Sequence, residues 1–289
     1  MKSLIVNNVS KSYKRKSALK DISFEVEKGE LFGVIGPDGA GKSTLFRIMT
    51  TLILADKGEV KIEGYDVVKD YKKIRNIVGY MPGRFSLYQD LTVRENIEFF
   101  AAVFNTTVEE NYHLVKDIYS QIEPFEKRKA GALSGGMKQK LALSCALIHK
   151  PEVLFLDEPT TGVDPISRKE FWNMLKNLQE KGITIIVSTP YMDEATLCNR
   201  IALINEGEFM DINTPQELIR KFPKKLYSLN SDNLLNLMNI LREDPNVETS
   251  FSFGHSIHVT LNDETKHNGY QEIEPSIEDY FMRLSKPQN

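Results

Sequence analysis

The chain has 289 residues, a hydrophobic content of 41% and a formal net charge of -3, with a pI near 6.0. This length predicts one large domain, or one domain with a smaller appendix, and the balanced charge argues against nucleic acid as the main partner. Two cysteines in apolar patterns, Cys145 and Cys198, indicate core positions in a reducing compartment, and we expect a soluble protein because neither a signal pattern nor a membrane-spanning run is found.

The first part of the chain is predicted to consist of short strands. Ser3–Val9 and Ile22–Val26 are rich in β-branched residues, and Leu31–Ile35 is a buried, mostly apolar run. Tyr13 lies between the first two predicted strands, where a lone aromatic side chain is expected to serve packing. Gly58–Gly64 predicts a further strand and turn.

A glycine-rich loop follows Leu31–Ile35 and leads into a predicted helix that begins near Lys42. Strand, glycine loop and helix in this order give the context of a P-loop, whose backbone N–H groups form a nest for phosphate at the positive end of the helix. Lys42 is expected to reach the β- and γ-phosphates, and Ser43 to place its hydroxyl on Mg²⁺. The expected nucleotide contacts are Gly36, Pro37, Asp38, Gly39, Ala40, Gly41, Lys42, Ser43 and Thr44.

The middle of the chain is predicted to be mostly helical. Met81–Arg84 breaks regular structure, and Thr92 with Glu95 predicts a capped helix. A second helix is expected over roughly Tyr112–Ile122, and a third from Ser134 to about His149. Ser134, Gly135 and Gly136 alone are compatible with a phosphate-binding helix end or with an ordinary capped loop.

Val153–Asp157 predicts a buried parallel strand that ends in two acids, Asp157 and Glu158. Ligands gather at the carboxyl ends of such strands, so Asp157 is expected to hold Mg²⁺ and Glu158 to orient the attacking water or accept its proton. The alternative is a pair of acids that simply meets solvent.

Further elements follow these acids. Asp164 and Pro165 predict a capped helix, Ile183–Ser188 a buried strand, and the segment after Pro190 a helix with Asp193 and Glu194. Beyond about Lys224 we expect a small α+β region without identifiable chemistry. Its histidines, His255 and His258, lack metal-site spacing, so a solvated strand face is expected for them.

Taken together, the motifs resemble those of ABC (ATP-binding cassette) transporter ATPases. The matching segments are the Walker A loop Gly36–Thr44, the signature Leu133–Lys140, the Walker B strand Val153–Asp157 with Glu158, and the D-loop Gly162–Asp164. The resemblance implies an α/β P-loop NTPase core at about 1–90 and 151–222, a helical subdomain at about 91–150, and a small α+β C-terminal domain at 223–289.

The resemblance also implies ATP and Mg²⁺ as cofactors and a second cassette as partner, forming a homo- or heterodimer. Tyr13 would then stack on adenine, while Ser134, Gly135 and Gly136 would contact ATP bound by the facing cassette. Lys42, Ser43 and Asp157 keep the roles given above.

Several segments are similar to the cassettes of ABC-2-type exporters, particularly the first cassette of multidrug exporters with two fused cassettes. They are Gly79–Pro82, Phe85–Tyr88, Leu91–Asn96, Asp164–Arg168 and Tyr191–Ala195. This resemblance implies a polytopic membrane permease as partner, meeting the apolar segment Gly83–Leu91, and a peripheral location on the cytoplasmic face of the membrane. Packing of that segment against the helical subdomain remains the alternative.

Two positions depart from the family pattern. Gly83 stands where the family has a glutamine, and Pro190 where it has a histidine that holds the γ-phosphate. Neither residue has a side-chain donor, so we expect ATP binding but slow hydrolysis, unless backbone or neighbouring side chains compensate. A regulatory ATP-binding module and a non-transport ABC ATPase stay open as alternatives to an exporter subunit.

Overall fold

A computed structural model describes residues 1–14, 16–84, 86–266 and 270–285. Its contacts divide the chain into two compact units, Met1–Ile212 and Asn213–Asn289, each with its own sheet and core. None of the helices within these described ranges is long and apolar enough to cross a membrane.

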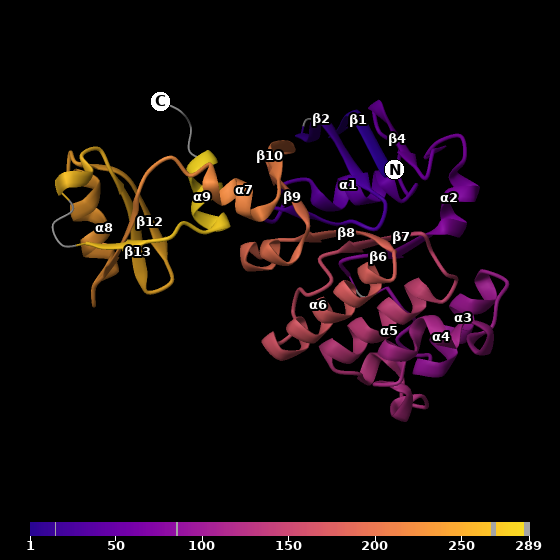
Figure 1. Ribbon diagram of the computed structural model, residues 1–289. Helices are drawn as coiled ribbons and strands as arrows, with labels where there is room; N and C mark the ends of the chain where they lie inside the picture. Colours follow the sequence, from indigo (N-terminus) through magenta and orange to yellow (C-terminus); the bar gives the residue numbers. More distant parts are fainter. Residues whose placement is uncertain (15, 85, 267–269, 286–289) are drawn as a thin grey trace. The chain divides into compact units, whose positions relative to one another are not determined.

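The centre of the first unit is a sheet with the strand order β10-β9-β3-β8-β7-β6 (Figure 1). Its strands are β3 (Leu31–Ile35), β6 (Val78–Met81), β7 (Val153–Asp157), β8 (Thr184–Thr189), β9 (Arg200–Asn205) and β10 (Glu208–Asn213). The pairs β9–β3, β3–β8, β8–β7 and β7–β6 are parallel, and every residue of β3, β7 and β8 is buried. Continuous apolar runs form such strands because both faces of the sheet are covered.

A second, antiparallel sheet has the order β2-β1-β4-β5. It contains β1 (Lys2–Tyr13), β2 (Lys16–Glu27), β4 (Lys57–Ile62) and β5 (Tyr65–Asp66). Helix α1 (Lys42–Met49) shares one apolar cluster with both sheets, to which Leu45, Val6 and the edge-on ring pair of Phe46 and Phe155 belong. This core fixes the helix at the carboxyl edge of β3, where the glycine loop lies.

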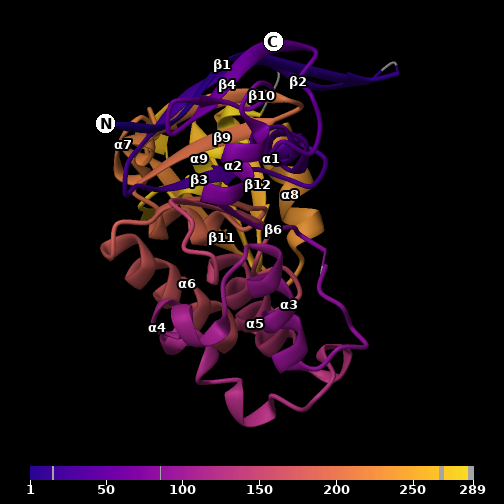
Figure 2. The same cartoon turned by 90° about the vertical axis from the view of Figure 1, so that its right-hand side faces the viewer.

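The remaining helices of the first unit are α2 (Tyr71–Ile77), α3 (Val93–Val103), α4 (Val108–Tyr119), α5 (Gly135–Leu147) and α6 (Pro165–Glu180). Of these, α3 to α6 lie together on the side of the central sheet away from α1 (Figures 1 and 2), whereas α2 lies near β4 and contacts β5 and β6 (Figure 1). Helices α3, α4 and α5 contact one another, and α5 also contacts α6. Both α3 and α4 begin with a complete capping box, at Thr92 and Thr107.

The second unit is a small α+β structure with the strand order β12-β13-β11-β14, all antiparallel. Its elements are α7 (Pro215–Arg220), β11 (Leu226–Asn230), α8 (Leu234–Glu243), β12 (Val247–Phe253), β13 (Ser256–Leu261), β14 (Gln271–Ile273) and α9 (Ile277–Leu284). By its contacts this unit begins at Asn213, before the boundary expected at 222/223, and within it α7 contacts α9.

The P-loop NTPase fold predicted from the sequence is confirmed, and several elements differ in detail. Tyr13 ends strand β1 instead of lying in a loop between strands. Helix α4 begins earlier than expected because Thr107 and Glu110 cap it. The helix expected after Pro190 is a short 3₁₀ turn, Met192–Leu197, whose Glu194 points into the interior.

The expectation for His258 was wrong, because its side chain is not on a solvated face. Its Nδ1 lies 2.7 Å from Oδ1 of buried Asp279, and its ring stacks on Phe253. Asp279 also accepts hydrogen bonds from Ser276, the N-cap of α9, so the pair ties β13 to that helix. The two partners are 21 residues apart in the sequence, so a local pattern could not predict their contact. His255 is exposed, as expected.

Candidate nucleotide site

The glycine-rich loop follows β3 and ends at α1, and two of its glycines are required by close backbone approaches. A Cβ on Gly36 would lie 2.1 Å from the carbonyl oxygen of Ile204, and one on Gly41 would lie 2.5 Å from that of Ala18. Gly41 also has a φ of 111°, which strains any other residue. The sequence therefore adopts this loop because glycine alone fits between β9 and β2.

Lys42 lies at the first position of α1 with a side chain that is only 2% exposed. Its ammonium donates to the carbonyl oxygens of Gly36 and Pro37, at 2.7 and 2.9 Å, and lies 3.1 Å from Oε1 of Glu158. The loop thus curls around a buried positive charge that faces the acid after β7.

Asp157 and Glu158 lie together at the carboxyl end of β7, as the sequence predicted. Oδ1 of Asp157 accepts a 2.6 Å hydrogen bond from the hydroxyl of Ser188, which in turn accepts one from the backbone N–H of Glu158 at 3.0 Å. Glu158 has a φ of 52°, a conformation that costs a non-glycine residue about 1–3 kcal/mol. Sequence reasoning missed the role of Ser188, whose only signal was its place at the end of the neighbouring predicted strand.

Two cavities adjoin this centre and share Ser43 and Glu158. The larger, of about 620 Å³, is lined by Ser43, Arg47, Leu52, Tyr80, Pro82, Gly83, Arg84, Asp157 and Glu158. The smaller, of about 250 Å³, is lined by Tyr13, Lys16, Ala18, Gly39, Gly41, Lys42, Ser43, Thr44 and Glu158. We refer to these two adjoining cavities together as the trough, whose lining extends from Tyr13, past the loop, to Gly83.

The larger cavity has a mixed electrostatic character. Burial, together with the nearby carboxylate of Asp157, raises the pKa of Tyr80 to about 12, so this phenol stays neutral. Arg47 and Arg84 also line the cavity, and neither was singled out in the sequence. Two arginines and two acidic residues in one lining suit a ligand that carries both phosphates and a cation.

The residue types present fit Mg²⁺ without a dedicated protein cage. In the described part of the chain, no group of three or more His, Cys, Asp or Glu side chains is placed to hold a metal ion. Mg²⁺ usually takes one or two protein oxygens and completes its shell with phosphates and water. Ser43 and Asp157, which line the same cavity, offer such oxygens.

The remaining predicted site residues lie outside these two cavities. Ser134 caps α5, is exposed, and accepts a hydrogen bond from the Met137 N–H, while Gly136 packs so tightly that a Cβ would lie 2.7 Å from Oγ of Ser167. Pro190 follows β8, and the preceding carbonyl of Thr189 accepts a hydrogen bond from the N–H of Gly36. Pro190 therefore directly follows a residue that is hydrogen-bonded to the phosphate loop.

The fold and the trough define a P-loop nucleotide-binding protein, and comparisons with known proteins identify its family. Residues 19–161 match the model of the family described as ABC transporter. The chain is 37% identical over 284 residues to the probable multidrug ABC transporter ATP-binding protein YbhF of Escherichia coli (strain K12), covering 93% of this chain and 49% of YbhF. It therefore spans about half the length of that relative.

Two further similarities cover most of both chains. The Nod factor export ATP-binding protein I of Rhizobium sp. (strain N33) is 33% identical over 291 residues, covering 96% of this chain and 95% of the relative. The dimeric, post-hydrolysis structure of the ATP-binding cassette MJ0796 with ADP and Pi superimposes with a TM-score of 0.67 at 29% identity, covering 73% and 98% of the two chains. This chain belongs to the ABC transporter ATP-binding family.

Proposed function

We propose that this chain is the ATP-binding subunit of an ABC-2-type exporter, working at the cytoplasmic face of a membrane with a separate permease. Two observations carry the proposal. A complete phosphate loop and two acids line one trough, and the helix start Ser134-Gly135-Gly136, of which Ser134 and Gly135 are exposed, lies outside it. That division suits two cassettes that complete each other's sites. The names of the relatives, which mention multidrug transport and Nod factor export, support the exporter class.

In the proposed mechanism, different residues of the trough contact the adenine, the phosphates and the Mg²⁺ of Mg-ATP. Tyr13, 46% exposed, offers its ring to adenine at the open end. Loop residues 36–44 cradle the phosphates, and Lys42 exchanges its bonds with the Gly36 and Pro37 carbonyls for phosphate oxygens. Ser43 and Asp157, which line the same cavity, would hold Mg²⁺, and the ion would neutralise charge on the phosphates.

Glu158 is the proposed water-orienting residue and general base. Its carboxylate is paired with Lys42, so turning Lys42 toward phosphate releases it to face the attacking water. Hydrolysis is proposed to be slow, because Gly83 and Pro190 present no side-chain donor beside the γ-phosphate. A partner cassette that has the glutamine and the histidine would then supply the faster site. Ser134, Gly135 and Gly136 of this chain would complete that site.

The proposed permease contact is the segment Gly83–Leu91. Phe85 lies outside the described residues, Leu87 is buried, and Tyr88 is half-exposed with its ring edge-on to Phe99 at 4.9 Å. Leu87 also lines an apolar cavity of about 390 Å³ between this segment and helices α3 and α5. An exposed aromatic pair beside an apolar cavity is suited to a helical segment of another protein.

Gly83 and Pro190 also favour a second candidate, a regulatory cassette that binds ATP without appreciable turnover. Affinity capture of the tagged full chain from solubilised membranes, followed by an ATPase assay of the captured complex, separates the candidates. Recovery of a polytopic membrane protein with ATP-dependent turnover supports the exporter subunit. Recovery of the same complex with trapped, unhydrolysed ATP supports the regulatory cassette, and recovery of no membrane protein contradicts both.

Ser188→Ala is expected to raise the Mg²⁺ concentration needed for half-maximal ATP binding by about tenfold or more, because outer-shell partners orient metal ligands. The change removes the hydroxyl that fixes Asp157. Ser144→Ala is the matched control, since that serine is equally buried but its hydroxyl donates to the Lys140 carbonyl on α5, outside the trough. Magnesium titrations of nucleotide binding measure the effect, and an unchanged midpoint in Ser188→Ala would remove Ser188 from the metal site.

A further inference from the structure

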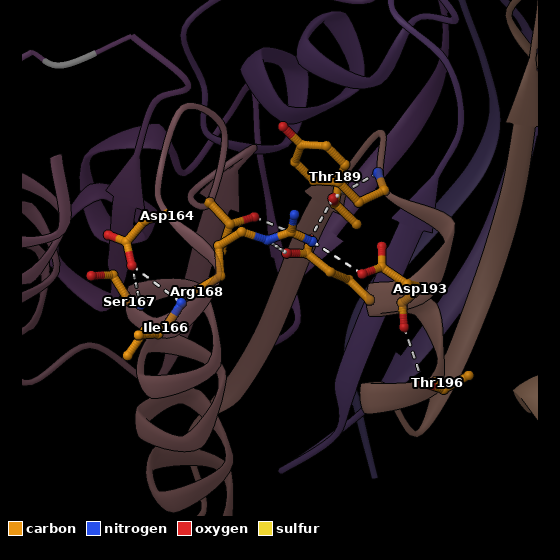
Figure 3. A network of polar contacts seen from close by, with 10 residues as sticks. Asp164, Ile166, Ser167, Arg168, Thr189, Asp193 and Thr196 are labelled. Atoms are coloured by element: carbon orange, nitrogen blue, oxygen red, sulfur yellow. Dashed lines mark hydrogen bonds and ion pairs between the residues drawn. The ribbon is translucent and has the colours of Figure 1, made fainter. Parts of the chain in front are cut away.

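A buried carboxylate outside the trough connects segments that border it. Glu194 lies on the 3₁₀ turn after Pro190, and its side chain is 3% exposed. Its Oε2 accepts hydrogen bonds from the hydroxyls of Thr160 at 3.0 Å and Thr189 at 2.6 Å, and its Oε1 accepts one from Nε of Arg168 at 3.1 Å. Figure 3 shows Arg168 reaching across from α6 to this network, with Asp193 and Thr189 beside it.

The three donors come from three segments, each next to a part of the site. Thr189 ends β8, where its carbonyl bonds the first glycine of the phosphate loop. Thr160 follows Glu158 by two residues, and the turn between them is closed by the Thr161 N–H bonding the Glu158 carbonyl. Arg168 lies in the first turn of α6, which is capped by Asp164 through the N–H groups of Ile166 and Ser167 (Figure 3).

Pro190 makes this arrangement stiffer. The Thr189 hydroxyl accepts from the Tyr191 N–H at 3.1 Å while it donates to Glu194, so one hydroxyl bridges the proline. Proline has a fixed φ and lacks an N–H, and a buried charge with several charge-assisted hydrogen bonds is costly to displace. The segment from Thr189 to Glu194 therefore acts as a fixed support for its neighbours.

We propose that Glu194 is a positioning residue that, through Thr160, holds Glu158 in its strained backbone conformation and, through Arg168, sets the place of the Gly162–Asp164 turn. The proposal rests on the proposed ATPase function. It assigns the turnover step, rather than nucleotide binding, to this buried contact, because no atom of Glu194 lines either cavity of the trough.

Thr160→Val removes one hydroxyl from the network and nearly keeps the side-chain shape. We expect kcat to fall roughly 10- to 100-fold, the effect of one lost hydrogen bond to a charged group, while KM for ATP stays unchanged. Thr160→Ser keeps the hydroxyl and is expected to retain wild-type turnover. Thr184→Val, a buried threonine at the other end of β8 whose hydroxyl bonds Gly29, is the control for losing a buried hydroxyl.

A second measurement tests the positioning role of Glu194 without relying on ATPase turnover, in case the wild-type rate is too slow to compare variants. Burial raises the pKa of both native thiols, Cys145 and Cys198, so a spin label attaches selectively to Ile166→Cys, at a site on α6 that is 74% exposed, or to Val103→Cys, which is 56% exposed on α3. Glu194→Gln is expected to increase the mobility of the label at position 166 and leave the label at 103 unaltered.

The outcomes are distinguishable. Wild-type protein that neither binds nor hydrolyses Mg-ATP contradicts the proposed function and leaves the label experiment to test the network. Unchanged label mobility in Glu194→Gln, or equal losses of turnover in Thr160→Ser and Thr160→Val, would overturn the positioning role.

Discussion

Mg-ATP affinity is expected to fall by about 100-fold or more when Lys42 is replaced by alanine, since hydrogen bonds to charged groups contribute about 1.5–3 kcal/mol each and tenfold in affinity corresponds to about 1.4 kcal/mol. Lys42 is the buried cation of the phosphate loop and makes two bonds to loop carbonyls that a triphosphate would replace. The substitution also leaves Glu158 without its partner. Equilibrium binding of Mg-ATP to the full chain measures the loss.

Lys176→Ala is the matched control, because that lysine is exposed on α6 and away from the trough. It should bind Mg-ATP as the wild type does. Unfolding followed by the fluorescence of Trp172, the single tryptophan of the chain, checks that Lys42→Ala remains folded. A folded Lys42→Ala variant with wild-type affinity would show that the trough is not the ATP site.

Local patterns were sufficient to predict the elements that form the trough. The strands Leu31–Ile35 and Val153–Asp157 have the bounds that their apolar runs predicted, and α1 begins at Lys42 as expected. Asp164 caps α6 through two backbone N–H groups, again as the residue order indicated. These features depend on neighbours in the sequence, so the sequence alone is informative about them.

Contacts between distant segments were not predictable in the same way. Ser188 and Asp157 are 31 residues apart, and Glu194 and Thr160 are 34 residues apart. In each pair the partner depends on how distant segments are placed side by side in the fold, and the sequence analysis did not predict the strand order. The same holds for His258 and Asp279, where a single-sequence pattern suggested solvent and the fold provides a buried acid.

Restoring the missing donors is expected to increase turnover. The double substitution Gly83→Gln with Pro190→His should raise the ATPase rate of the full chain by about 100-fold, since one donor to a transition state is worth about 100- to 1,000-fold and such effects are not additive. Gly83 lines the cavity beside Asp157, and its φ is not in the left-handed region, so a side chain is allowed there.

The two single variants are expected to differ. A Cβ at position 83 would lie 3.0 Å from the carbonyl oxygen of Asp157, so that strand end must shift by a few tenths of an ångström and part of the gain is lost. Pro190→His adds an N–H and an imidazole beside the phosphate loop, but it loosens the bridge that the Thr189 hydroxyl makes over the proline. Each substitution thus has its own structural cost, and we expect each single variant to gain less ATPase activity than the double variant.

Arg84 provides the decisive comparison, because it directly follows Gly83 and lines the same cavity. If Arg84 already supplies the missing donor, the wild-type chain will turn over at a rate typical of active enzymes, on the order of 10 per second, and Arg84→Ala will abolish it. If Arg84 does not supply the donor, the wild-type ATPase rate will be slow and Arg84→Ala will not change it. The double variant Gly83→Gln with Pro190→His will still hydrolyse ATP faster than the wild type. A fast wild type that is insensitive to Arg84→Ala would contradict both explanations and place the transition-state donors elsewhere, on the backbone or on the facing cassette.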